Sequence, residues 1–215
     1  KEIHTFTIQE IANLVAAAQD SPYYAPLMCC LFPGLREGEA LGLAWAHVNF
    51  ENGNVLICQQ LQKEKSKGGK FYIQEGTKNG QNRVLDVPDF LFVILKDEKQ
   101  HQLLAHLSAG PAWQNVWGLC FTDALGQCIN PHTLWVNFKR IAASIGLPDA
   151  RVHDLRHTNA TLALVNGDDL KTVQANLGHA TAAFTLQRYV HASEAMKRAS
   201  ANRMQQFFDD NVKKA

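Results

Sequence analysis

The sequence has 215 residues and a formal net charge of +1, with 46% apolar and 19% charged residues. Chains of this length and composition fold as one or two globular domains with a sizeable core. No apolar run approaches the ~18–20 residues of a transmembrane helix, and residues 1–20 lack the layout of a signal peptide. We therefore expect a cytoplasmic protein without a membrane partner.

The cysteines argue against two common architectures. Their number is odd, two are adjacent, and no pair has the C-x-x-C spacing of a zinc ribbon. A disulfide framework also requires an oxidising compartment, so a reducing compartment fits this chain better. The five residues are Cys29, Cys30, Cys58, Cys120 and Cys128.

The first fifty residues predict helices. Thr7 to Glu10 form a capping box before apolar residues at helical spacing. The apolar run 23–32 is typical of a buried helix, and Pro33–Gly34 ends it. Arg36 then begins a new helix. Taken alone, Arg36 is more typical of a surface arginine paired with a neighbouring glutamate.

Between residues 47 and 88 the apolar period changes from about 3.6 to about 2, which indicates strands. Asn52–Gly53 and Asn79–Gly80 are typical hairpin turns. We predict a three-stranded antiparallel sheet with Lys78 near the tip of its last hairpin. The strand segments lie at about 48–50, 55–57, 70–76 and 83–87.

The same region is locally basic, with six cations against two carboxylates between residues 58 and 83. Ordinary solvated lysines explain this stretch as well as a nucleic-acid partner does.

The rest of the chain again predicts helices. Asn130–Pro131 is a cap followed by a first-turn proline, and Gly167 and Gly178 are helix stops. The helices are expected at about 89–107, 131–145, 153–166, 169–177, 182–190 and 192–208. We expect His153, Arg156 and His157 to stand toward one rim of their helix.

The last third of the sequence brings together residue types suited to phosphate chemistry. An arginine fork matches two phosphate oxygens, and histidine transfers protons near neutral pH. A tyrosine with a pKa of about 10 is roughly 0.1% ionised at pH 7, so it needs a nearby cation or base to act as a nucleophile. His153, Arg156, His157, His179 and Tyr189 together favour phosphoryl transfer through a covalent tyrosine intermediate.

Five sequence boxes, in family order, resemble the tyrosine recombinase (phage integrase) family, from about Thr7 to about Ser193. They are GLREGE at 34–39, GTKNG at 76–80, HDLRH at 153–157, LGH at 177–179 and TLQRYVH at 185–191. The resemblance implies an α+β, mainly helical catalytic domain over residues 1–215, with a core at about 7–191 and a C-terminal helical tail at 192–215. We expect this chain to be a fragment without the core-binding domain that family members place before the catalytic domain.

The resemblance also implies a site-specific DNA recombinase, an integrase that integrates or excises a mobile element through a 3′-phosphotyrosine, without metal, ATP or cofactor. Arg36 and Arg156 would clamp the scissile phosphate, and Tyr189 would attack it. Lys78 would protonate the leaving 5′-oxygen, and His153 would assist proton transfer. An Arg156→Ala change should then abolish cleavage and barely alter the melting temperature.

The remaining expectations concern supporting residues and partners. By resemblance His179 would hydrogen-bond the phosphate, while Glu39 and His157 would support the catalytic residues. Expected DNA contacts are Lys70, Arg83, Lys139 and Arg151. The family further implies double-stranded DNA, a homotetramer on paired DNA sites, and accessory DNA-bending or directionality proteins as partners.

Three other functions fit parts of this pattern. A type IB topoisomerase uses similar chemistry without strand exchange, and a binding-only regulator would have lost activity. His153 and His157 at i, i+4 could also ligate a metal, but the general-base glutamate of H-E-x-x-H is missing and Arg156 would repel a cation.

Overall fold

Helices form most of the chain that the computed structural model describes, namely residues 4–66, 68–76, 82–178, 202 and 204–205. The helices are α1 (Ile8–Ala18), α2 (Tyr24–Leu31), α3 (Glu37–Leu41), α4 (Asp89–Ala109), α5 (Pro131–Ser144), α6 (Val152–Asn166) and α7 (Leu170–Leu177), with 3-10 turns at Trp45–His47 and Gly110–Ala112. The strands are β1 (Val48–Asn49), β2 (Asn54–Ile57), β3 (Gln59–Lys63), β4 (Phe71–Glu75) and β5 (Arg83–Asp86).

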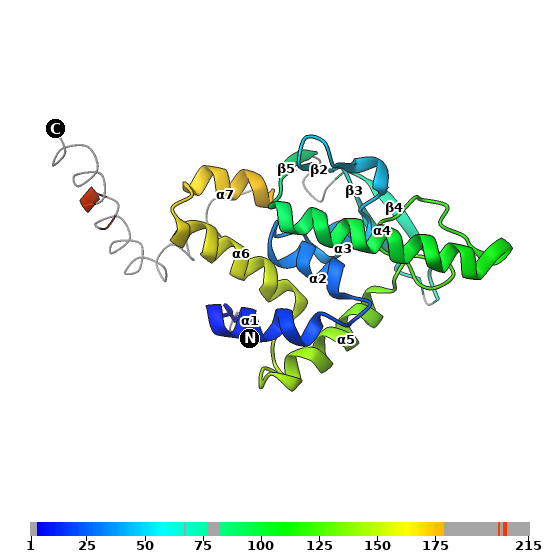
Figure 1. Ribbon diagram of the computed structural model, residues 1–215, viewed down its shortest axis with the longest axis horizontal. Coiled ribbons are helices and arrows are strands. Elements are labelled where there is room, and N and C mark those ends of the chain that lie inside the picture. The colour runs from blue at the N-terminus through cyan, green and yellow to red at the C-terminus, as the bar shows by residue number, and fades with distance from the viewer. Residues whose placement is uncertain (1–3, 67, 77–81, 179–201, 203, 206–215) are drawn as a thin grey trace.

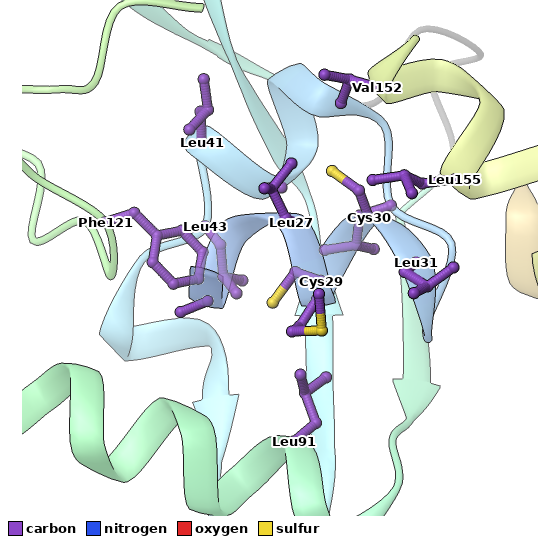
Figure 2. Packing of buried hydrophobic residues seen from close by; sticks show 14 of the residues in the cluster. Leu27, Cys29, Cys30, Leu31, Leu41, Leu43, Leu91, Phe121, Val152 and Leu155 are labelled. Carbon is purple, nitrogen blue, oxygen red and sulfur yellow. The ribbon is translucent and has the colours of Figure 1, made fainter. Parts of the chain in front are cut away.

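Helix α2 is the centre of the hydrophobic core. Every residue from Ala25 to Leu31 is buried. Figure 2 shows Leu27, Cys29, Cys30 and Leu31 of this helix surrounded by side chains from other elements. The labelled neighbours are Leu41, Leu43, Leu91, Phe121, Val152 and Leu155. Because α6 packs directly on α2, Arg156 and Asn159 of α6 reach the carbonyls of Gly34 and Phe32 that follow α2.

The predicted helix boundaries are confirmed by their caps. Thr7 and Glu10 form the capping box of α1, and Asn130 accepts a hydrogen bond from the backbone N–H of His132 at the start of α5. Helices α6 and α7 end at Gly167 and Gly178, both left-handed. The helix expected at 182–190 and the tail at 192–215 lie outside the described residues, apart from 202, 204 and 205.

The small antiparallel sheet of three strands is confirmed, but the predicted strand pairing is wrong. Its order is β1-β2-β5, with Val48 opposite Val55 and Ile57 opposite Arg83. Strand β4 does not join this sheet. It pairs instead with β3 in a separate two-stranded sheet, where Leu61 lies opposite Ile73.

Strand β3 was missed because its sequence, QQLQK, has weak β-propensity and no clear alternation. Tertiary contacts hold it in place. The Gln59 side chain donates to the carbonyl of Gly42 (2.7 Å), and a Cβ on Gly42 would lie 2.6 Å from the backbone nitrogen of Leu61. Only a glycine allows the backbone after α3 to approach β3 this closely.

Figure 1 shows the strands on one side of the described fold, α1 and α5 on the other, and α2 and α3 between them. Helices α6 and α7 pack on each other, and α7 also contacts β5. A second cluster of buried apolar side chains, Ala160, Leu164, Val173 and Leu177, joins α6 to α7. Among the described helices, none is long and apolar enough to cross a membrane.

Candidate active site

Four segments far apart in the sequence meet beside the C-terminal end of α7. They are the turn before α3, the first half of α6, the end of α7 and the start of β5. Figure 1 shows α7 beside β5, at the end of the molecule where α6 also lies. Each segment contributes an arginine or a backbone carbonyl, so the site exists only in the folded chain.

The turn before α3 positions Arg36. Gly34 has φ +68°, and a Cβ there would lie 2.5 Å from Leu177 Cδ2 and 2.7 Å from Asn159 Oδ1. The turn therefore requires glycine on both conformational and steric grounds. Arg36 is the residue immediately before α3, and its Nη2 donates to the carbonyl of Gly178 (2.8 Å).

Arg156 lies on α6 and is 2% exposed. Its Nη1 donates to the carbonyl of Gly34 (2.5 Å), and its Nη2 donates to the carbonyl of Leu177. The expectation that Arg156 and His157 stand at a rim is wrong, because both side chains are buried and only His153 is exposed. The guanidinium can be buried because backbone carbonyls from two different segments accept its hydrogen bonds.

Glu39 is the carboxylate at the centre of the site, and its side chain is 0% exposed. Arg36 donates to it from Nη1 (2.6 Å) and from its backbone N–H (3.0 Å). Arg156 Nη1 lies 3.9 Å away. Burial alone would raise the pKa of Glu39, but the hydrogen bond and charge of Arg83, together with the contacts of Arg36, lower it to about 2.

Arg83, one of the expected DNA contacts, donates hydrogen bonds to protein oxygens at this site. Its Nη1 and Nη2 donate to the two oxygens of Glu39 (3.1 and 2.7 Å), and its Nε donates to the carbonyl of Asn176 (2.8 Å). The side chain is 9% exposed. This bidentate geometry is the strongest form of an arginine–carboxylate pair.

The arginines of the site outnumber the carboxylate that they contact. Three arginines, Arg36, Arg83 and Arg156, surround the single carboxylate of Glu39. Burial first, and then the positive charge of Arg36, lower the pKa of Arg156 to about 9. The guanidinium therefore still carries its charge at neutral pH. An excess of buried positive charge favours binding of an anion at this position.

His153 stands at the exposed edge of this cluster. Its ring meets that of His157 edge-on, with centroids 4.5 Å apart. Partial burial of the ring first, and then the positive charge of Arg156, lower the pKa of His153 below its ordinary value. A neutral imidazole beside the arginines can accept a proton at neutral pH.

The other expected DNA contacts are differently placed. Lys70 is exposed beside β4. Lys139 Nζ donates to the carbonyl of Pro148 (2.7 Å). Arg151 is the residue immediately before α6, and its side chain pairs with the buried carboxylate of Asp154 (2.7 Å), although a third of the side chain remains exposed. The structure therefore brings none of these three cations into the arginine cluster.

Three expected catalytic residues, Lys78, His179 and Tyr189, lie outside the described residues. Among the residues that the structure does describe, no group of three or more His, Cys, Asp or Glu side chains could hold a metal ion.

Sequence reasoning missed two features of the site. No local spacing links Glu39 to Arg83, which lie 44 residues apart. Asn159, whose side-chain amide donates to the carbonyl of Phe32 behind the Gly34 turn, also carried no recognisable signal. An invariant pattern across related sequences could have marked both positions.

Comparison with known proteins shows the family of this chain. The model of the phage integrase family matches residues 4–196. The tyrosine recombinase XerC-like protein of Caldanaerobacter subterraneus subsp. tengcongensis is 30% identical over 215 residues, which cover 96% of this chain and 55% of that protein. The putative prophage phiRv2 integrase of Mycobacterium tuberculosis is 26% identical, over 93% of this chain and 50% of that protein. The chain thus spans about half the length of these curated relatives.

Solved structures share the fold. The Tn1549 transposon integrase in complex with transposon right end DNA superposes with a TM-score of 0.76 at 20% identity, over 95% of this chain and 67% of that one. The XerA recombinase gives a TM-score of 0.69 at 22% identity, over 93% and 65%. With the family model covering most of the sequence and the arginine boxes meeting in one site, the chain belongs to the phage integrase family, the tyrosine recombinases.

Proposed function

We propose that this chain is the catalytic domain of a site-specific recombinase that cleaves and rejoins double-stranded DNA. The observation that carries the proposal is the buried cluster in which Glu39 and the end of α7 hold Arg36 and Arg156 together. A phosphodiester is a single anion, and two arginine forks held in fixed positions suit its non-bridging oxygens.

In the proposed reaction the Tyr189 hydroxyl attacks the scissile phosphorus, and the bond from phosphorus to the 5′-oxygen breaks. Lys78 gives its proton to that oxygen, and neutral His153 takes the proton of the tyrosine. Arg36, Arg156 and His179 stabilise the extra charge of the transition state. The 3′-phosphotyrosine retains the bond energy, so a 5′-hydroxyl from a second DNA can reverse the step without ATP.

Arg156 can serve both the fold and the phosphate. A guanidinium has five N–H donors in a rigid plane, and the contacts with Gly34 and Leu177 use two of them. Those two contacts fix the plane of the fork before DNA arrives. Such preorganisation lowers the barrier, because no reorientation is then needed during the reaction.

We extend the proposal to the partners and the location. A homotetramer on paired DNA sites would bring two duplexes together, and accessory DNA-bending or directionality proteins would select the direction of exchange. Because DNA is the substrate, the activity would belong in the compartment that holds the DNA, the cytoplasm. Residues 192–215 would form a C-terminal tail, and a core-binding domain in the longer protein would complete a clamp around the DNA.

The test is a covalent-trapping assay. The protein is incubated with labelled DNA that spans an end of its own element and is nicked near the cleavage point, so that the cut fragment diffuses away. A labelled protein–DNA adduct on a denaturing gel is expected for the wild type and for Tyr23→Phe, a tyrosine immediately before α2. Tyr189→Phe should give no adduct. An adduct that persists in Tyr189→Phe would refute the assigned nucleophile.

A second assay separates the recombinase from the topoisomerase alternative, which the relatives do not favour. A supercoiled plasmid without an element end should remain supercoiled in the presence of the protein. Efficient relaxation of that plasmid would contradict site-specific recombination.

A further inference from the structure

The C-terminal end of α7 is bound by three arginines at three consecutive carbonyls. Arg83 Nε donates to Asn176 (2.8 Å), Arg156 Nη2 donates to Leu177, and Arg36 Nη2 donates to Gly178 (2.8 Å). The last carbonyls of a helix have no partner within the helix and carry its negative partial charge. Arg36 and Arg156 form the proposed phosphate clamp, so Arg83 binds the same helix end as both clamp arginines.

Arg83 also binds the carboxylate that orients Arg36. It holds both oxygens of Glu39, and Glu39 in turn holds the side chain and the backbone N–H of Arg36. Gly178 packs against the Arg83 guanidinium, since a Cβ at residue 178 would lie 3.1 Å from Nη1. The Arg83 side chain therefore contacts the carboxylate that orients the clamp and the helix end to which the clamp is bound.

We infer that Arg83 is a positioning residue for the proposed cleavage reaction, and that it does not bind DNA phosphate. This inference rests on the proposed function. All three guanidinium nitrogens of Arg83 already donate to protein oxygens, and two of them hold both oxygens of Glu39. Reaching a phosphate would break the bidentate pair with Glu39 and leave that buried carboxylate without its main partner.

Arg83 is connected through the chain to two of the expected catalytic residues. His179 follows Gly178 directly, and Lys78 precedes Arg83 by five residues. Arg83 on β5, which follows Lys78 in the chain, thus contacts the end of α7, which precedes His179. A shift of about 1 Å in catalytic groups can lower a rate by roughly a hundredfold, so loss of this contact should slow the reaction more than it weakens binding.

The experiment separates positioning from phosphate contact. Arg83→Ala, Arg83→Lys and the control Arg140→Ala, an exposed arginine on α5, are compared with the wild type in the trapping assay at saturating protein. We expect the single-turnover rate of both Arg83 variants to fall by about tenfold or more, because lysine cannot form the bidentate fork. Arg140→Ala should stay within about twofold of the wild type.

DNA affinity provides the second readout. Anisotropy with the same DNA over a series of salt concentrations gives the slope of log Kd against log salt. A lost phosphate contact lowers this slope by about 1, whereas a lost positioning residue leaves it unchanged. Methylguanidinium added to Arg83→Ala should restore part of the cleavage rate. It should not restore Glu39→Gln, which keeps Arg83 but lacks the carboxylate charge.

The outcomes are distinct. A wild-type rate in both folded Arg83 variants, or a reduced salt slope, overturns the inference and leaves the proposed function intact. If Arg83→Ala fails to fold, Arg83→Lys keeps the cation and decides the question. Absence of the adduct in the wild type itself refutes the proposed function, and the inference falls with it.

Discussion

Arg156 combines two roles that are normally separate. It is a cation proposed to bind phosphate, and it is also the largest fully buried side chain in the described part of the chain. Its two carbonyl contacts join the Gly34 turn to the end of α7. A buried charge is tolerated only where such partners are present, so the structure around Arg156 depends on the guanidinium as much as the chemistry does.

Replacing Arg156 should therefore destabilise the fold. Arg156→Ala leaves the carbonyls of Gly34 and Leu177 without this donor and opens a cavity, which should lower the free energy of unfolding by about 2–5 kcal/mol. The expectation from the sequence, that the melting temperature would barely change, does not take this burial into account. Thermal unfolding of Arg156→Ala beside Arg140→Ala checks the point. Equal melting temperatures would contradict it.

His153 should determine the acid limit of cleavage. Its pKa is lowered from 6.5, so the neutral form that accepts the tyrosine proton persists to lower pH than for an ordinary histidine. The acid limb of the single-turnover rate should therefore be centred below pH 6.5. His153→Gln should be slower and lack this limb, while His132→Gln, an exposed histidine on α5, should keep the wild-type profile. A limb centred above 6.5 would refute the assignment.

At the scale of elements, the turn between α2 and α3 packs closely against both α6 and α7. A Cβ added at Gly34 would meet both Asn159 of α6 and Leu177 of α7. Arg36 can reach the carbonyl of Gly178 only because this turn lies so close to the end of α7. The position of the first clamp arginine is thus set by backbone packing at a glycine.

Gly34→Ala should consequently damage both stability and activity. The left-handed conformation costs a non-glycine residue about 1–2 kcal/mol, and the clash with Leu177 and Asn159 adds to that cost. Gly146→Ala is the matched control, because Gly146 is also left-handed but a Cβ added there would meet no atom within 4 Å. Gly34→Ala should lose clearly more stability than Gly146→Ala and should also lose adduct formation. Equal losses in the two variants would show that the close approach is unimportant.

At the scale of the whole molecule, the Glu39 cluster ties α3, α6, α7 and β5 into one unit. It joins the main hydrophobic core, which is centred on α2, to the smaller cluster between α6 and α7. Interactions that connect two apolar clusters make their unfolding cooperative, so the charge state of Glu39 should affect the stability of the entire described fold.

The predicted consequence is acid sensitivity. Glu39 has a pKa of about 2 in the folded protein, compared with an ordinary pKa of 4.5. Its stabilising contribution is therefore complete above pH 4.5 and is lost as the pH falls toward 2. The contribution is on the order of 3 kcal/mol, given about 1.4 kcal/mol for each tenfold change in acid dissociation. Chemical denaturation at several pH values should show this loss in the wild type and in the exposed-site variant Glu51→Gln. Glu39→Gln should be less stable near neutrality and lack this part of the acid loss, and a wild-type profile in that variant would contradict the prediction.

The sequence by itself determined the family, the mainly helical α+β class and most helix boundaries. Caps such as Thr7 and Asn130 and stops such as Gly178 act within a few residues, so their signals can be read locally. The tertiary structure alone decided the strand pairing, the burial of Arg156 and the engagement of Arg83 with Glu39. These features depend on contacts between segments far apart in the chain. Strand β3 has weak intrinsic propensity and is held by its packing on Gly42. An arginine on a strand also looks the same in sequence whether it faces solvent or a buried carboxylate, because its partner is chosen only when the chain folds.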